Sequence, residues 1–426
     1  MISHRIVAEL VPVNTNPKTT ISKIKQMEEI KAELAITKSQ LDKEYEGKNM
    51  REFDKYWKQC DPFKEEKAIV AKLGNTSNVS NAWLKCYEIL VHYDLIPQKL
   101  VNSEFTHFDN AAFPGSFIIS THHLVATSRD WFESYKWYGS SLISTNELDA
   151  SPLEDKYELY KNYPDKWLMS AENNGDVLSI KNQMDFRKRL GGKVDLYTSD
   201  LGFDVSSDYN NQEILQCPAN IGQIISGLLT LRKGGSFITK QFTTFESITI
   251  SVMYAVAYFF DEFYICKPYT SREANSETFL VGKGFKGEIS IDHPYIVALF
   301  DKVKLFDESG ANNEDDKVKI EIPIIDIGKL PMTYLKSLIK INKDIYNRQI
   351  NKLNDDISRV YSAQRESRKI NFKGHPSQNP IIKEYIESIN ATMEEWYLKM
   401  NILPLLKYKK LNMKDIFYQS KFSFKY

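Results

Sequence analysis

The chain of 426 residues carries 56 Lys and Arg against 56 Asp and Glu, so its formal net charge is zero. This balance excludes a nucleic-acid binder that is basic throughout, as histones are, although a single region can still be basic. The hydrophobic fraction of 42% and the charged fraction of 26% are typical of globular proteins. The length predicts two or three domains.

Cysteine content and hydropathy indicate an intracellular protein. The four cysteines are scattered and form no C-x-x-C pair, so neither a disulfide scaffold nor a structural zinc site is expected. The first residues lack the apolar core of a signal peptide. The longest apolar run, residues 252–260, is about half of the roughly 20 residues that a membrane-spanning helix needs. We therefore expect a soluble cytoplasmic protein without membrane or metal.

Residues 1–75 are predicted to form a helical extension. Within residues 21–46, apolar side chains recur at helical spacing, among them Ile24, Ile30 and Leu34, and Gly47 ends the pattern. We expect this amphipathic helix to pack on the domain that follows. The alternative is that it binds a partner protein.

Residues 76–300 alternate between short apolar runs and helical patterns. Strands are predicted at 194–198, 236–239, 262–266 and 278–282, and helices at 213–231 and 247–260. This alternation of strands and helices favours an α/β sheet with helices on both faces.

Residues 301–426 are predicted to be mainly helical. Residues 307–316 are acidic and poor in apolar side chains, which indicates a surface loop, and a helical pattern follows Pro331. A break is expected at 374–380 because Gly and Pro cluster there. The tail, residues 407–426, contains six Lys and six Tyr or Phe. We expect it to pack as an ordinary terminus, with stacking on nucleic-acid bases as the alternative.

Four segments of the middle region carry candidate functional residues. They are residues 80–89 (SNAWLKCYEI), 194–200 (VDLYTSD), 234–240 (GGSFITK) and 267–281 (KPYTSREANSETFLV). Taken singly, Lys85, Asp200 and Glu277 could each be a surface residue. Lys240 is more suggestive, because ligands of open α/β sheets bind at the carboxyl ends of strands.

Taken together, the four segments resemble the FtsJ-like (RrmJ-type) RNA ribose 2′-O-methyltransferases. The family patterns S-x-A-W-x-K-x-x-E-I, D-x-x-x-S-D, G-G-S-F-x-x-K and K-P-x-x-S-R-x-x-x-S-E-x-x-x-V occur here in order. Residues 137–142, 174–177 and 240–246 resemble the Adrift-type cap-specific mRNA enzymes, and the whole chain resembles the FtsJ-like methyltransferases of asfarviruses. The resemblance covers roughly residues 79–286.

The resemblance implies a Rossmann-like methyltransferase sheet, S-adenosylmethionine as the methyl donor, and RNA, in particular capped mRNA, as the substrate. It implies an intracellular viral enzyme, in the cytoplasm or packaged in a virion. It assigns Lys85, Asp200, Lys240 and Glu277 to catalysis: Lys240 would be the general base and Lys85 its electrostatic partner. Asp200 would orient Lys240 and face the donor, and Glu277 would position Lys85 or the ribose.

The segment that corresponds to the donor loop departs from the family. The family has D-x-G-x-x-P-G-G, or E-A-P-G-x-F in cap enzymes, where residues 109–117 read DNAAFPGSF. The resemblance places the donor near Asp109, Pro114, Gly115, Ser116, Asp176 and Asp200. Ala111 replaces a Gly or Asn, and Phe113 replaces an Ala and could fill part of the donor pocket. The alternative is therefore a methyltransferase fold that binds RNA or protein without catalysis. For the acidic residue that holds the donor ribose, Asp130 and Glu133 are candidates.

Charge is unevenly divided along the chain. Residues 76–300 carry 19 basic and 27 acidic residues, whereas residues from Lys340 onward carry 17 and 9. Because an acidic domain attracts a phosphate backbone poorly, we expect the C-terminal helical region to supply or complete the RNA-facing surface. The adjacent residues His122 and His123 are expected on a helix surface. Residues 187–189 are expected at a helix C-terminus, and for this segment an RNA contact is the alternative.

Overall fold

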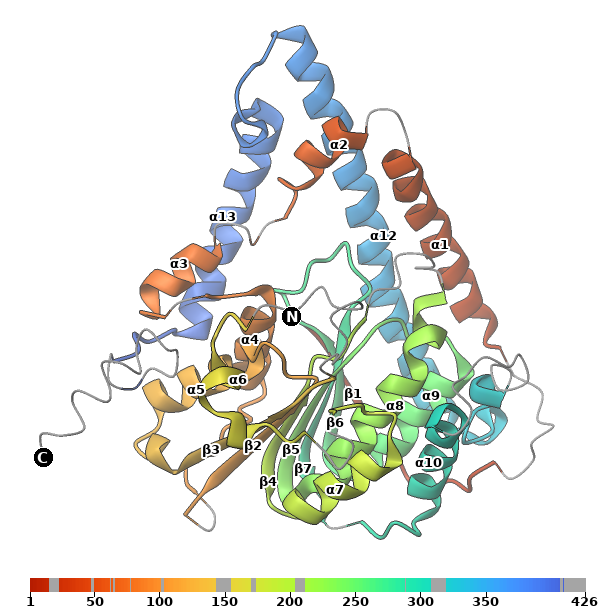
Figure 1. The fold of residues 1–426 in the computed structure, drawn as a ribbon. Helices are drawn as coiled ribbons and strands as arrows, with labels where there is room; N and C mark the ends of the chain where they lie inside the picture. Colours follow the sequence, from red (N-terminus) through yellow and green to blue (C-terminus); the bar gives the residue numbers. More distant parts are fainter. Residues whose placement is uncertain are drawn as a thin grey trace, which may run out of the picture.

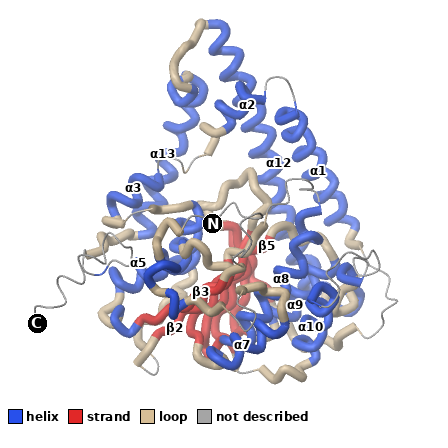
Figure 2. The backbone as a smooth tube through the Cα atoms, viewed as in Figure 1, coloured by secondary structure: helices blue, strands red, loops and turns tan. Residues whose placement is uncertain are grey.

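One mixed sheet of seven strands forms the centre of the computed structural model (Figures 1 and 2). The structure describes residues 1–14, 23–46, 50–61, 63, 66–76, 78–100, 103–142, 155–169, 174–203, 211–287, 289–307, 319–406 and 409. The predicted acidic loop and most of the C-terminal tail lie outside these residues.

The strand order is β1-β6-β7-β5-β4-β2-β3. β2, β3, β4 and β5 run parallel, and β7, β6 and β1 continue the sheet with antiparallel pairing. The strands are β1 (Ile2–Ile6), β2 (Phe105–Asn110), β3 (Tyr135–Ser140), β4 (Val194–Ser199), β5 (Leu231–Gln241), β6 (Phe260–Lys267) and β7 (Thr278–Phe285). Each of the four strands predicted from the sequence falls within one of these.

Helices cover both faces of the sheet, and the alternation of side chains along each strand explains why. Leu196 and Ile238 point toward α4 and α5, whereas their neighbours Tyr197 and Phe237 point toward α7, α8 and α9. The predicted Rossmann-like α/β fold with terminal helices is confirmed. The covering helices are α4 (Asn81–His92), α5 (Ser116–Ser128), α6 (Leu159–Asn162), α7 (Ile180–Leu190), α8 (Gln212–Thr230), α9 (Ser247–Ala257) and α10 (Pro294–Asp307).

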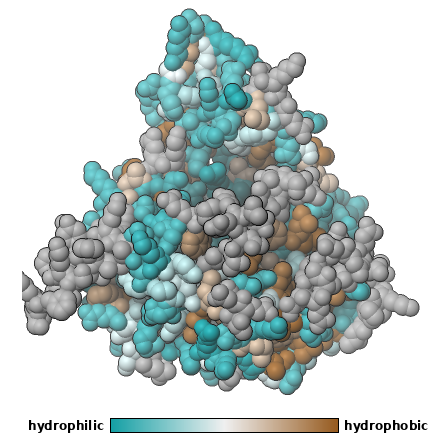
Figure 3. All heavy atoms as spheres, in the orientation of Figure 1, coloured by the Kyte–Doolittle hydropathy of each residue, from teal (hydrophilic) through white to brown (hydrophobic). Residues whose placement is uncertain are grey.

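The terminal helices form an arch over one edge of the sheet (Figure 1). They are α1 (Lys25–Glu46), α2 (Met50–Trp57), α3 (Glu66–Leu73), α12 (Met332–Lys369) and α13 (Pro380–Met400). Phe53 of α2, Val360 of α12 and Ile382 of α13 share a small core near the apex. The apex is largely hydrophilic on the face shown in Figure 3. The two ends of the chain therefore fold together rather than as separate appendages.

The first residues differ from the expectation of a helical extension. Ile2–Ile6 form β1, which pairs antiparallel with β6 and brings Ile2 opposite Lys267. A five-residue strand at a sheet edge has too short a pattern to be recognised beside the 22-residue helix that follows.

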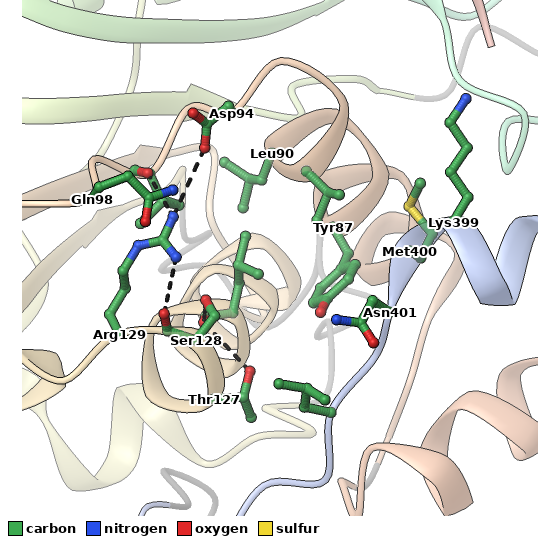
Figure 4. Close-up of a pocket in the computed structure, with 14 residues that line it drawn as sticks. Tyr87, Leu90, Asp94, Gln98, Thr127, Ser128, Arg129, Lys399, Met400 and Asn401 are labelled. Carbon is green, nitrogen blue, oxygen red and sulfur yellow. Dashed lines mark hydrogen bonds and ion pairs between the residues drawn. The ribbon is translucent and has the colours of Figure 1, made fainter.

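The expectation that His122 and His123 lie on a helix surface is wrong. Both are buried, because α5 is covered by the segment that follows α13. His122 Nε2 lies 2.6 Å from the carbonyl oxygen of Lys409, and His123 Nε2 lies 3.0 Å from that of Leu403. The same segment closes a cavity of about 230 Å³ between α4 and α5 (Figure 4).

The described helices include none that is both long and apolar enough to cross a membrane.

Candidate active site

Four sequence-predicted residues meet at one edge of the sheet. Lys85 lies in the middle of α4, and Asp200 follows the last residue of β4. Lys240 lies near the end of β5, and Glu277 immediately precedes β7. Since β7 is antiparallel to β5, its beginning lies at the edge where the parallel strands end. The sheet topology thus gathers residues separated by up to 192 positions.

The four side chains alternate in charge. Lys85 Nζ lies 2.7 Å from Glu277 Oε2 and 4.0 Å from Asp200 Oδ2. Lys240 Nζ lies 3.2 Å from Asp200 Oδ1 and donates a hydrogen bond of 2.9 Å to the Asp200 carbonyl oxygen. The order in space is therefore Glu277, Lys85, Asp200, Lys240, so each inner group contacts an opposite charge on both sides.

Burial and charge set the protonation of the Lys85–Glu277 pair. Burial opposes the charged form of Lys85, but the Asp200 and Glu277 carboxylates outweigh it and raise the pKa of Lys85. Burial likewise opposes ionised Glu277, and Lys85 and Lys240 outweigh it, so the pKa of Glu277 is lowered. Lys85 is held as an ammonium group and Glu277 as a carboxylate.

A buried loop positions Glu277, and the residues that hold this loop have no role in the sequence-based prediction. Glu88 accepts hydrogen bonds from the backbone N–H groups of Tyr269 and Thr270 at 2.8 and 2.9 Å. Lys267 Nζ donates to the carbonyl oxygens of Asn275 and Glu277, at 2.9 and 2.8 Å. Glu88 and Lys267 both stand in the family motifs, so their spacing from Lys85 and Glu277 was the available signal.

The other motif acid, Asp195, has a structural role. Its carboxylate pairs with Arg232 and accepts a hydrogen bond of 2.8 Å from the Thr106 backbone N–H. These contacts tie the beginning of β4 to β2 and β5, at the opposite edge of the sheet from Asp200.

Helix α12 is hydrogen-bonded to the segment after β5, which follows Lys240, and to the loop that carries Glu277. Its Asn342 exchanges hydrogen bonds with Thr244, and its Tyr346 hydroxyl donates to the Phe242 carbonyl oxygen at 3.1 Å. One turn on, Gln349 donates to the Ala274 carbonyl oxygen at 3.0 Å and accepts from the Ser276 hydroxyl. No motif predicted the contact of Gln349 with Ala274, because it joins residues 75 positions apart.

The residues predicted to hold the donor gather at the same edge of the sheet. Ala111, after β2, packs with Val177 and with Leu201, which follows Asp200. Asp176 is partly buried beside them and caps its own turn by accepting from the Leu178 N–H at 2.9 Å. Asp109 is buried and accepts from the Thr198 hydroxyl at 2.6 Å, and burial raises its pKa well above the ordinary range. Asp109 thus holds the sheet rather than facing a ligand.

The glycine turn is partly filled by the chain itself. Gly115 has φ +110°, and a Cβ at this position would lie 2.5 Å from Leu159 Cδ1. The peptide bond between Phe113 and Pro114 is cis, and the Phe113 ring packs against Trp167 with centroids 6.0 Å apart. Ser116 begins α5 and contacts the hydroxyls of Ser80 and Tyr157. Small side chains and the N-terminal end of α5 fit a donor molecule here. Leu159 and Phe113, in contrast, take up space that an open glycine loop would leave free.

Two sequence candidates for the donor ribose are in the wrong place. Asp130 and Glu133 precede β3, so they lie at the amino end of this parallel strand. The site lies at the carboxyl ends.

The described residues contain no cluster of three or more His, Cys, Asp or Glu side chains that could hold a metal ion.

A cavity of about 770 Å³ adjoins the four residues. Lys240 and Glu277 line it on one side, and α1, α2 and α12 supply much of the rest.

Comparison with known proteins identifies the family to which the sheet region is similar. Residues 78–285 match the family model described as "FtsJ-like methyltransferase". These residues form an FtsJ-like methyltransferase domain. The limits agree with the range of about 79–286 over which the sequence motifs resemble that family.

Relatives of the FtsJ-like domain include viral and animal proteins. The chain is 38% identical over 234 residues to "Probable methyltransferase EP424R" of African swine fever virus, covering 52% of this chain and 53% of that protein. It is 30% identical over 352 residues to "Uncharacterized protein L511" of Acanthamoeba polyphaga mimivirus, covering 81% and 40%. It is 31% identical over 226 residues to "Cap-specific mRNA (nucleoside-2'-O-)-methyltransferase 2" of Mus musculus, covering 52% and 29%. The chain thus matches about half the length of the first relative and less of the others.

Proposed function

We propose that this chain transfers a methyl group from S-adenosylmethionine to the 2′-oxygen of an RNA ribose, close to the 5′ cap of an mRNA. The observation that carries the proposal is the alternating set Glu277, Lys85, Asp200 and Lys240 at the carboxyl edge of the sheet. The name of the mouse relative supports a capped substrate.

The chemistry requires a base for the ribose hydroxyl. S-adenosylmethionine supplies an electrophilic methyl group when bound. Lys85 is held as an ammonium group by Asp200 and Glu277, so it cannot take a proton. Lys240 is the remaining amine, and in the proposal its Nζ receives the hydroxyl proton as the oxygen gains the methyl group.

In the proposal, Asp200 and Glu277 orient the two lysines. Asp200 contacts both lysines and thereby fixes Lys240 toward the strand ends, where the donor residues gather. Glu277 fixes Lys85, and Lys267 and Glu88 fix the loop that carries Glu277. Alignment of hydroxyl, base and methyl group supplies the larger part of the rate in such reactions.

The test is transfer of labelled methyl groups to capped RNA, with the methylated atom identified by nuclease mapping. We expect transfer with the native chain and a loss of at least about 100-fold with Lys240→Ala, since a general base contributes about 10²–10⁴. Lys233→Ala is the matched control, because Lys233 is exposed at the start of β5, away from the site. Absence of transfer by the native chain, or equal rates for Lys240→Ala, contradicts the proposal.

A second candidate function is RNA or protein binding without catalysis. It is favoured by the contact of Leu159 with Gly115 and by Ala111, which has φ +52° where the family uses Gly or Asn. Calorimetric titration with S-adenosylmethionine separates the two candidates. Binding supports the enzyme, and its absence at millimolar donor supports the second function.

A further inference from the structure

Half of the residues that line the cavity beside Lys240 and Glu277 come from outside the FtsJ-like domain. Its lining residues are Lys38, Leu41, Asp42, Tyr45, Trp57, Gln212, Lys240, Phe242, Ala274, Asn275, Ser276, Glu277, Gln349 and Leu353. The first five belong to α1 and α2, and the last two to α12. Its volume of about 770 Å³ lies within the range of roughly 300–1,000 Å³ that is typical of ligand sites.

The position of the cavity restricts what can enter it. If the 2′-hydroxyl of a ribose meets Lys240, the base is attached at the neighbouring carbon of the same ring. The base must then lie next to Lys240. The cavity offers space beside Lys240, and residues of α1 and α12 line it.

The lining suits a nucleobase better than a phosphate group. Its charged residues are Lys38, Asp42, Lys240 and Glu277, which sum to zero, so a phosphate gains no net attraction. The amide of Gln212 can donate and accept hydrogen bonds, whereas the amides of Asn275 and Gln349 already bond within the cavity wall.

Aromatic side chains supply the surface on which a base can stack. Tyr45, Trp57 and Phe242 all line the cavity. Trp57 stacks on Phe53 through one face, with ring centroids 5.7 Å apart, and Tyr45 packs edge-on against the same ring. Phe53 is buried and fixes both rings from behind.

We propose that this cavity receives the base of the RNA nucleotide whose ribose is methylated, and that α1, α2 and α12 are therefore part of the substrate site. The inference rests on the proposed function. The inference goes beyond the proposed function because it places recognition of the target nucleotide on segments outside the FtsJ-like domain.

The first experiment compares steady-state methyl transfer by full-length variants over a range of RNA concentrations. We expect Trp57→Ala and Tyr45→Ala to raise the KM for RNA by about 5-fold to 150-fold, the effect of losing one stacked base, with the KM for the donor unchanged. Trp57→Phe keeps an aromatic face and restores most of the affinity. Tyr361→Ala is the matched control: Tyr361 also packs on Phe53 but is 43% exposed and does not line the cavity.

Unchanged KM for RNA in both alanine variants overturns the inference. So does an equal rise with Tyr361→Ala, because that result assigns the effect to the packing around Phe53. Failure of the native chain to methylate RNA is a separate result, which contradicts the proposed function itself.

The second experiment needs no substitution and covers the case in which an alanine variant does not fold. Native protein is irradiated with RNA that carries 5-iodouridine at the methylated position, and the attached peptide is identified by mass spectrometry. Attachment to a segment that lines the cavity (residues 38–45, 57, 212, 240–242, 274–277 or 349–353) supports the inference. Attachment only to other segments overturns it.

Discussion

Lys85 and Lys240 carry the same side chain, and their neighbours give them different properties. Lys85 lies between two carboxylates on a helix whose buried face holds it at the site. Lys240 contacts Asp200 through its carboxylate and its carbonyl oxygen, lies 5.6 Å from the centroid of the Phe242 ring and also faces the cavity. The difference comes from Glu277, which reaches Lys85 at 2.7 Å. The proposed division of roles between Lys85 and Lys240 thus depends on the position of Glu277.

Removing the charge of Lys85 should therefore cost stability as well as activity. Lys85→Met leaves Glu277 buried with less compensation, and we expect a loss of about 3 kcal/mol in the free energy of unfolding. This is the lower end of the range for buried pairs, because Lys240 and Lys267 still face Glu277. Urea denaturation at pH 7 measures the loss. The double variant Lys85→Met, Glu277→Gln should recover part of it, and a double variant less stable than either single one contradicts the pairing.

The pH dependence of this difference follows from the two pKa shifts. The pKa of Glu277 is lowered in the folded chain, so its contribution is present above its unfolded value near 4.5 and is lost as the pH falls toward about 2. The pKa of Lys85 is raised, so its contribution is complete below its unfolded value near 10.5. The difference in the free energy of unfolding between the native chain and Lys85→Met should hence decrease below pH 4.5 and stay constant from about pH 6 to 9. If this difference in unfolding free energy does not change down to about pH 3, Lys85 and Glu277 do not form a charged pair.

Helix α12 links the terminal region to the segments beside the candidate site. Its residues Asn342, Tyr346 and Gln349 lie on one face and reach the loops after β5 and before β7. The same helix lines the cavity through Gln349 and Leu353. We expect a change in its position to displace the segments next to Lys240 and Glu277, so in the proposed function α12 supports the site.

Gln349→Leu tests this support. The buried carbonyl of Ala274 and hydroxyl of Ser276 lose their partner, which should cost about 1–3 kcal/mol of stability. We expect kcat to fall by about tenfold or more while donor affinity stays unchanged, because the donor residues lie on other loops. Asn347→Leu makes a comparable change on the exposed side of the same helix and serves as control. Equal kcat values for the two variants exclude a role of α12 in positioning.

The sequence patterns predicted four of the seven strands, and the resemblance to FtsJ-like enzymes supplied the four residues that meet at the carboxyl ends of the strands. Strand periods and motif spacing are local, and parallel strands bring their carboxyl ends to a common edge. Contacts between distant segments were not predictable in this way. The pairing of β1 with β6, the burial of His122 under the segment after α13 and the bond from Gln349 to Ala274 each depend on tertiary packing. The division at residues 75 and 300 remains a proposal about the sequence.

Charge and architecture favour a model in which the middle region holds the candidate site and the terminal helices contact the RNA. The acidic middle region holds the four charged residues, while the terminal helices stand above this edge with a largely hydrophilic apex (Figures 1 and 3). The residues from Lys340 onward carry 17 basic against 9 acidic residues. Deleting this region is a poor test of RNA binding, because Tyr346 and Ile350 of α12 are buried in the main core.

Charge reversal on the exposed side of α12 is the sharper test. Lys343 and Arg348 are exposed, so Lys343→Glu and Arg348→Glu should leave the fold intact. If these side chains attract the RNA backbone, each variant weakens RNA binding, and the slope of log affinity against log salt concentration falls by about 0.7 for each phosphate that is no longer neutralised. Lys233→Glu makes the same charge change at the opposite edge of the sheet and should leave the slope as it is. An equal effect of all three substitutions would assign the attraction to net charge alone, whereas an effect confined to α12 places the RNA backbone along this helix, beside the cavity that Gln349 and Leu353 line.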